Sequence, residues 1–317
     1  MLRVFLKNRK NYGRITLLYL CLLSLFIVSC DNGDQVIKQH QKLAVVTSLF
    51  PLYDFAKNIG KDKADVSLLL PPGVEPHSYE PKPGDIIRIH EADVFIYTDA
   101  AMEPWAAKIL QAIENKNLLV IEAGKGIPHM KESSEEDGGH GGTDPHIWLD
   151  FANAQHMVDT ICEGFSAKDP ANKTFYADNA RAYNGLLDKL DSRYKKTLAH
   201  CKYSVIVHGG HFAFGYLAKR YNLHYVAAYG FSPDAEPTPR RLYDLSEMIK
   251  QKGVKYLFYE ELLSPRVAKT IAQETGATLL KLSAAHNITK EELEQNVSFI
   301  SIMEQNLKNL STGLQCQ

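Results

Sequence analysis

The sequence has no hydrophobic run long enough to cross a bilayer as a helix. Its longest apolar stretch, residues 15–28, has about fourteen residues, whereas a membrane-spanning helix needs about 20. An excess of basic residues is also absent, since 36 Lys and Arg stand against 37 Asp and Glu and the formal net charge is −1. Without a basic footprint, no nucleic-acid partner is expected.

Cysteine is scarce, with 5 in 317 residues, and no two cysteines have C-x-x-C spacing. None lies near a histidine motif, which argues against a thiolate metal site. The H-E-x-x-H pattern, which supplies metal ligands and a general base in many zinc hydrolases, is missing as well. Cys162, Cys201 and Cys316 remain after the leader, and one disulfide can form among them, but spacing does not select the pair.

The N-terminus carries a short basic and apolar leader that ends in Ile27-Val28-Ser29-Cys30. Small residues ahead of a cysteine, after a short hydrophobic core, indicate a secretory signal. The pattern resembles the bacterial lipobox, whose cysteine is lipidated, and a signal anchor is the alternative. We expect residues 1–29 to be a signal peptide, Cys30 the lipidated residue and 30–42 a flexible tether. The protein is then exported and lipid-anchored, facing the periplasm or the cell exterior.

Beyond the tether, short apolar stretches alternate with helical patterns, which predicts an α/β fold of two lobes. Each lobe is expected to hold a mainly parallel sheet flanked by helices, over residues 43–168 and 201–317. Between them, apolar residues recur at spacings of four and three from Tyr176 to Leu198. This stripe predicts one long, rigid helix within 169–200 that joins the lobes. A final helix is expected at 291–310.

Residues 129–143 interrupt this alternation with glycine and acidic residues. Such a composition buries little apolar surface and predicts a mobile loop. Two interpretations stay open for it: a solvated insertion without a function, or a loose flap that collects metal through the histidines it contains.

Four histidines lie just beyond predicted strands, where open parallel sheets bind ligands. They are His77, His146, His211 and His286, two from each half of the sequence. We therefore expect them to meet in the cleft between the lobes. A metal-binding imidazole also needs its second nitrogen held by an oxygen, and Asp144 and Asp150 flank His146 for this task.

Three longer motifs surround these histidines: Pro-Gly-Val-Glu-Pro-His-Ser-Tyr-Glu-Pro at 72–81, Asp-Pro-His-Ile-Trp-Leu-Asp at 144–150, and the segment from His211 to Tyr216. Together with residues 230–239, they resemble the solute-binding proteins of zinc and manganese ABC importers, of the periplasmic zinc-binding lipoprotein type. The resemblance covers nearly all of the mature chain. It implies two α/β lobes joined by one long helix, a monomer, and an ABC permease as the membrane partner.

The resemblance also implies that His77, His146 and His211 are metal ligands. Imidazole nitrogens suit Zn²⁺ better than Mn²⁺, which favours carboxylates. Many relatives have an aspartate at the fourth position, where this chain has Ser283-Ala284-Ala285-His286. We expect His286 to complete a four-histidine site, with water or Glu260 as the alternative. Supporting positions are assigned to Glu75, Asp144, Asp150, His208 and Glu260.

The sequence thus predicts a binding protein that captures Zn²⁺ and performs no catalysis. Metal affinity is expected to fall as the pH drops through roughly 6.5 and the imidazoles protonate. One alternative is a manganese-specific protein of the same family. Another is a zinc hydrolase with three histidines and an open position, for which Glu75 and Glu80 are the nearest general bases. An adhesin-like lipoprotein is a third, but it leaves the histidines without a task.

Overall fold

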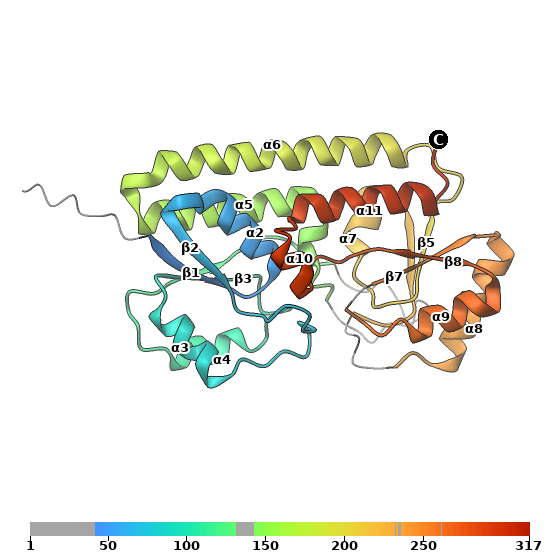
Figure 1. Ribbon diagram of the computed structural model, residues 1–317, viewed down its shortest axis with the longest axis horizontal. Coiled ribbons are helices and arrows are strands. Elements are labelled where there is room, and N and C mark those ends of the chain that lie inside the picture. The colour runs from blue at the N-terminus through green and yellow to red at the C-terminus, as the bar shows by residue number, and fades with distance from the viewer. Residues whose placement is uncertain (1–41, 131–142, 232, 234–235, 261) are drawn as a thin grey trace, which may run out of the picture. The chain divides into compact units, whose positions relative to one another are not determined.

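Residues 42–317 are organised around two four-stranded parallel sheets (Figure 1). The computed structural model describes residues 42–130, 143–231, 233, 236–260 and 262–317. The predicted signal peptide, Cys30, and the acidic segment from 131 to 142 lie outside the described residues. Within the described part of the chain, no helix is both long and apolar enough to span a membrane.

The first sheet has the strand order β2-β1-β3-β4. Its strands are β1 (Leu43–Thr47), β2 (Ala64–Leu68), β3 (Val94–Tyr97) and β4 (Leu119–Glu122). Val46 pairs with Phe95 in the register between β1 and β3, and the side chains of both are buried. Apolar strands of this kind need cover on both faces, which helices supply.

The second sheet repeats this order as β6-β5-β7-β8. Its strands are β5 (Val205–His208), β6 (His224–Ala227), β7 (Tyr256–Tyr259) and β8 (Thr278–Lys281). All pairs in both sheets are parallel, so the α/β fold class predicted from the sequence is confirmed. The carboxyl end of every strand in a sheet faces the same edge, where the loops can carry a site.

Helix α6 (Lys173–Leu198) has 26 residues and runs alongside α5 and α11 (Figure 1). This confirms the long helix predicted from the apolar stripe. The other described α-helices are α2 (Phe50–Gly60), α3 (Pro83–Glu91), α4 (Ala106–Ala112), α5 (Phe151–Lys168), α7 (Gly215–Arg220), α8 (Pro239–Lys252), α9 (Arg266–Thr275), α10 (Lys290–Glu294) and α11 (Phe299–Gly313). Short 3₁₀ turns cover Lys61–Lys63, Ile147–Leu149 and Pro170–Asn172.

One hydrophobic core extends through α2, α5, α6 and α11 and so belongs to both halves of the sequence. The rings of Phe55 on α2 and Phe299 on α11 meet edge to face, with centroids 5.2 Å apart. The buried Tyr183 hydroxyl on α6 donates to Asp54 at 2.6 Å. Because α6 is packed against elements of both halves, it acts as a stiff frame and not as a free linker.

One sequence expectation about helices needs correction, and two helices were missed. The final helix predicted for 291–310 is interrupted: α10 ends at Glu294, Asn296 takes a left-handed φ of 53°, and Ser298 caps a new helix, α11. Helices α3 and α5 were not predicted at all. For α5 a signal is present in the sequence, because aspartate is a preferred N-cap residue, and in the structure the Asp150 side chain accepts a hydrogen bond from the Ala152 N–H.

Candidate metal centre

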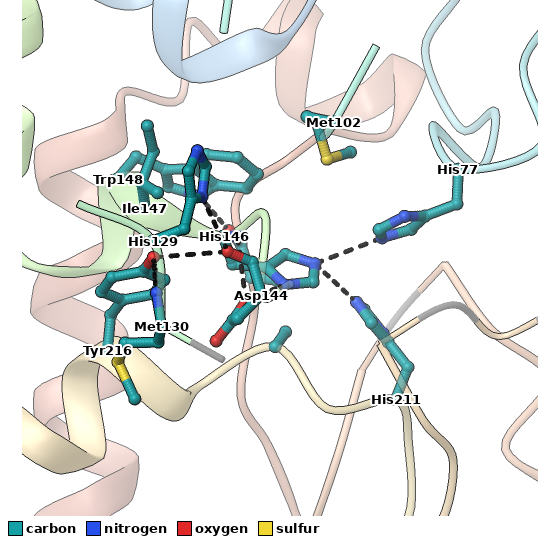
Figure 2. A network of polar contacts seen from close by, with 12 residues as sticks. His77, Met102, His129, Met130, Asp144, His146, Ile147, Trp148, His211 and Tyr216 are labelled. Carbon is teal, nitrogen blue, oxygen red and sulfur yellow. Dashed lines mark hydrogen bonds and ion pairs between the residues drawn. The ribbon is translucent and has the colours of Figure 1, made fainter. Parts of the chain in front are cut away.

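Three imidazoles from distant parts of the chain meet at the carboxyl edge of the sheets. Figure 2 shows His77 and His211 pointing toward the ring of His146. The Nε2 atom of His146 lies 3.2 Å from Nε2 of His77 and 3.0 Å from Nε2 of His211. The structure therefore brings together the three histidines that the sequence motifs singled out.

The spacing of these nitrogens suits a tetrahedral cation. With zinc–nitrogen bonds of 2.0–2.1 Å, two ligands of a regular tetrahedron are about 3.3 Å apart. The distances of 3.0 and 3.2 Å between Nε2 atoms come close to this separation between ligand atoms. The donor atoms of these three histidines all lie within 4.8 Å of one another, and so do those of His211, Glu260 and His286.

Asp144 holds the ring of His146 from behind. Its Oδ1 atom lies 2.8 Å from Nδ1 of His146 and also accepts a hydrogen bond from the His146 backbone N–H at 3.0 Å. Both side chains are buried. Because the carboxylate occupies the Nδ1 side, Nε2 is left to face the other imidazoles, which is the orientation a metal ligand needs.

Glu260 does the same for His211, although 49 positions separate the two residues. Its Oε1 atom lies 2.8 Å from Nδ1 of His211 and accepts the His211 backbone N–H at 2.8 Å. This places the carboxylate behind His211. The buried Tyr225 hydroxyl fixes the same loop by donating to the His211 carbonyl at 2.9 Å.

His286 follows β8 in the second half of the sequence, but hydrogen bonds tie its loop to the first half. Its carbonyl accepts the Phe50 N–H at 3.3 Å, and Trp148 donates its indole N–H to the Ala284 carbonyl at 2.8 Å. The Asn287 side chain donates to two carbonyls of the 71–74 loop, each at 2.8 Å. Two histidines thus come from each half of the sequence, as expected, but the loop that carries His286 is hydrogen-bonded to the first half.

The ring of His286 lies beside the other three, with centroid distances between 5.5 and 6.3 Å. Its Nε2 atom is 3.7 Å from Oε2 of Glu75, and Glu75 also accepts the His77 N–H at 3.1 Å. Burial alone would raise the pKa of Glu75, but the hydrogen bond and charge of His286 and the other nearby imidazoles lower it to about 2. Glu75 is therefore an anion at neutral pH.

Burial keeps the imidazoles of His77 and His146 uncharged. It lowers the pKa of His77 to about 3, helped by the neighbouring imidazole of His211. For the same reasons the pKa of His146 falls well below its ordinary value. The sequence led us to expect that the imidazoles protonate near pH 6.5, but both rings are still neutral at that pH. Each can therefore donate a lone pair to a cation at neutral pH.

The two carboxylates behind the rings differ in charge. Burial raises the pKa of Asp144 to about 8, and the His146 backbone N–H opposes this only in part. Glu260 is equally buried, but the charge and hydrogen bond of His211 outweigh that burial and lower its pKa to about 2. At pH 7 without metal, Asp144 is therefore protonated and Glu260 is ionised.

Two of the supporting positions assigned from the sequence have other tasks in the structure. Asp150 caps α5 and pairs with Arg220, whose Nη1 atom is 2.7 Å away, so its carboxylate serves the helix and not the His146 ring. His208 is fully buried, with Nδ1 3.1 Å from the Tyr225 hydroxyl and 3.1 Å from the His211 carbonyl. It supports the His211 loop and is absent from the described groups of close metal-binding atoms.

Sequence reasoning overlooked the structural tasks of Trp148 and Tyr225. Trp148 packs against His146, with ring centroids 5.5 Å apart, and anchors the His286 loop. Its place two positions after His146 is a weak signal that could have been used. Tyr225 lies in an ordinary apolar strand, and nothing in its local sequence distinguishes it.

The chain is similar to a known protein family over most of its length. The family described as zinc-uptake complex component A, periplasmic (ZnuA), matches residues 45–313. The high-affinity zinc uptake system protein ZnuA of Bacillus subtilis is 36% identical over 317 residues, covering 96% of this chain and 98% of its own. The zinc-binding lipoprotein AdcA of Streptococcus pneumoniae (strain ATCC BAA-255 / R6) is 36% identical over 305 residues, which is 94% of this chain. The match spans only 60% of AdcA's own length.

Solved structures of similar proteins have the same fold. The metal-dependent lipoprotein YcdH from Bacillus subtilis superimposes with a TM-score of 0.76 at 39% identity, covering 86% of this chain and 100% of that one. The Zn(II)-bound ZnuA-like domain of Streptococcus pneumoniae AdcA gives a TM-score of 0.74 at 36% identity, covering 86% and 99%.

Proposed function

Because the chain belongs to the ZnuA family of periplasmic zinc-uptake components, we propose that it captures Zn²⁺ outside the cytoplasm and delivers it to an ABC permease for import. The observation that carries this proposal is the convergence of three Nε2 atoms at 3.0 and 3.2 Å. Buried carboxylates stand behind two of the rings, as in many protein zinc sites.

Zinc is proposed over manganese because the donors are imidazoles of intermediate softness and not carboxylates. The test is metal analysis of the purified mature protein, followed by titration of the metal-free form with each ion. We expect one tightly bound zinc per chain that an excess of manganese does not displace. A protein that ignores zinc, or that prefers manganese, would contradict the proposal.

For the fourth ligand we propose His286. Its loop is fixed on the first half of the chain by Asn287 and Trp148, and its ring lies within 6.3 Å of each of the other three, measured between centroids. Glu260 already supports His211 from the Nδ1 side, which leaves His286 better placed than Glu260. A fourth imidazole would close the coordination shell, as a carrier requires and a catalyst does not.

His286→Ala should weaken zinc binding by roughly 100-fold, about the share of one ligand among four. Competition with a chelator of known affinity measures the change. Glu75→Gln is the matched comparison, because Glu75 is the nearest other candidate for the fourth position. Unchanged affinity in His286→Ala, or the larger loss in Glu75→Gln, would reject His286 as the ligand.

Zinc binding at pH 7 should release about one proton, because a metal on His146 requires the Asp144 carboxyl group to lose its proton. In the metal-free protein Asp144 is protonated at pH 7, since its pKa is raised to about 8. Zinc on Nε2 of His146 requires a hydrogen on Nδ1, which then donates to an ionised Asp144. Affinity should consequently rise with pH up to about 8 and level off above it.

Isothermal titration calorimetry at pH 7 in buffers of different ionisation enthalpy counts the released protons. Asp144→Asn should release about one proton fewer and bind zinc roughly 10- to 100-fold more weakly. Asp65→Asn, a change at an exposed aspartate on β2, should behave like the parent protein. An unchanged proton count in Asp144→Asn would show that the proton comes from elsewhere.

We further propose that Cys30 is lipidated after removal of residues 1–29, so that residues 30–42 tether the protein to a membrane. The lipobox-like end of the leader supports this, and AdcA is itself named a lipoprotein. Lobes 43–168 and 201–317, joined through 169–200, would then present the ion to the permease as one stiff monomer. The shared core around α6 supports small lobe movements on binding.

The relatives and the fold are those of zinc-uptake binding proteins and not of enzymes. The hydrolase alternative needed an open metal position and a general base. Glu75 accepts the His77 backbone N–H and lies near His286, so it belongs to the binding site. No observation favours Glu80 as a base.

A further inference from the structure

A groove with a volume of about 550 Å³ adjoins the imidazole cluster at His77. One wall is the segment that follows His77, including Tyr79 and Glu80, and the other is formed by Trp105, Lys108 and Gln111 near and on α4. His77 thus belongs to both the cluster and the groove. A ligand of the size of an amino acid fits in such a volume.

His77 is the exposed corner of the cluster. It is partly exposed, whereas His146 and His211 are 0% exposed and His286 is 2% exposed. Metal that arrives through the groove therefore meets His77 before the other three histidines, which do not line the groove. The groove thus borders the imidazole of the cluster that is most accessible to solvent.

The groove offers polar groups that the protein itself does not use. Within the described part of the chain, no hydrogen bond or ion pair engages the Trp105 indole N–H, the Lys108 ammonium or the Glu80 carboxylate. Trp105 is fixed in place by packing against Tyr79 and Phe95, with ring centroids 6.2 and 6.3 Å away. A cation beside a rigid aromatic surface matches the carboxylate and the side chain of a chelated amino acid, and the Glu80 carboxylate matches the ammonium group that forms once the amine has left the metal.

We propose that this groove receives zinc as an amino-acid chelate and that His77 takes the ion from it. The inference rests on the zinc-capture function proposed above and adds the chemical form in which zinc arrives. Lys108 attracts the carboxylate of the amino acid, while Trp105 packs against its side chain. The chelated ion is thereby held next to His77 instead of being released into water.

Transfer is an exchange of ligands without any redox change. The bond between zinc and the amino nitrogen of the chelate breaks as the bond to Nε2 of His77 forms, and the freed amine takes a proton from water. The remaining imidazoles then displace the other donor atoms of the chelate. The free amino acid, now able to pair with Glu80 through its ammonium group, leaves through the groove.

Stopped-flow fluorescence tests this in a Trp105→Phe background with zinc–histidine as the probe, because Trp148 is then the only tryptophan of the chain and packs against His146, where it reports the arrival of the ion. At a constant concentration of free zinc, the rate of loading should rise and saturate with zinc–histidine concentration. Lys108→Glu should slow loading from the neutral zinc–bis-histidine complex roughly three- to tenfold, because the lysine that attracts a carboxylate of the chelate is replaced by a like charge that repels it. Lys116→Glu, at an exposed lysine that does not line the groove, is the matched control.

Equilibrium zinc titration without histidine separates the two proposals. Failure to bind zinc in this titration would contradict the proposed zinc-capture function itself. Normal equilibrium binding, together with a loading rate that depends on free zinc alone, would contradict only the inference that zinc arrives as an amino-acid chelate. Equal slowing of Lys108→Glu and Lys116→Glu would also overturn it, because the effect would then be one of overall charge.

Discussion

His146→Ala is expected to lower the zinc affinity of the protein by about 100- to 1,000-fold. Apparent binding free energies of about 10–16 kcal/mol in four-ligand zinc sites correspond to about 2.5–4 kcal/mol for each ligand. Nε2 of His146 lies 3.2 Å from Nε2 of His77 and 3.0 Å from Nε2 of His211. Its loss would therefore remove the donor between two others and would also leave Asp144 without its ring partner.

Chelator competition measures this change, and circular dichroism of the metal-free variant confirms that the fold is kept. His224→Ala, at an exposed histidine on β6, is the matched control and should keep the parent affinity. If the two variants bound zinc equally well, the proposed site would be wrong. A variant that binds manganese but not zinc would point to a different donor set around the same position.

The second large effect is expected from the disulfide between Cys201 and Cys316, which closes a sequence separation of 115 residues. It ties the chain after α6 to the chain after α11, where the two cysteines also form an antiparallel bridge. Loop-closure entropy for a separation of this size predicts that a Cys201→Ala/Cys316→Ala variant loses about 5 kcal/mol of unfolding free energy. For a chain of this length, that corresponds to a fall in Tm of about 8 °C.

Differential scanning calorimetry with and without reductant measures the effect. Reductant should lower the Tm of the parent protein to that of the double variant and should leave the double variant unchanged. Cys162→Ala is the control, because the Cys162 thiol is free and its removal should not abolish the response to reductant. A parent protein insensitive to reductant, with its disulfide shown to be reduced, would contradict the prediction.

Local contacts were the part of the site that the sequence could predict. Asp144 lies two positions from His146, and its carboxylate reaches both the ring and the backbone of that residue. A spacing so short restricts the geometry whatever the rest of the fold does. The apolar stripe of α6 was readable for the same reason, because helical periodicity depends on neighbours three and four positions apart.

Contacts between distant segments were not readable in this way. Glu260 could be suggested near the site, but only the packing of β5 beside β7 places its carboxylate behind His211. The pairing of Cys201 with Cys316, and not with Cys162, likewise follows from the path of the chain after α6 and α11. Asp150 lies close to His146 in sequence and was expected to support its ring, but in the structure its side chain caps α5.

By itself, the sequence determined the α/β class, the long helix and the three histidine motifs, because each depends on periodicity or on residues close together in the chain. The tertiary structure alone decided which half of the protein holds the His286 loop, which carboxylate supports His211, and which imidazole meets the solvent. Those outcomes depend on hydrogen bonds and burial between segments far apart in sequence, such as Asn287 against the 71–74 loop, and no local pattern encodes them.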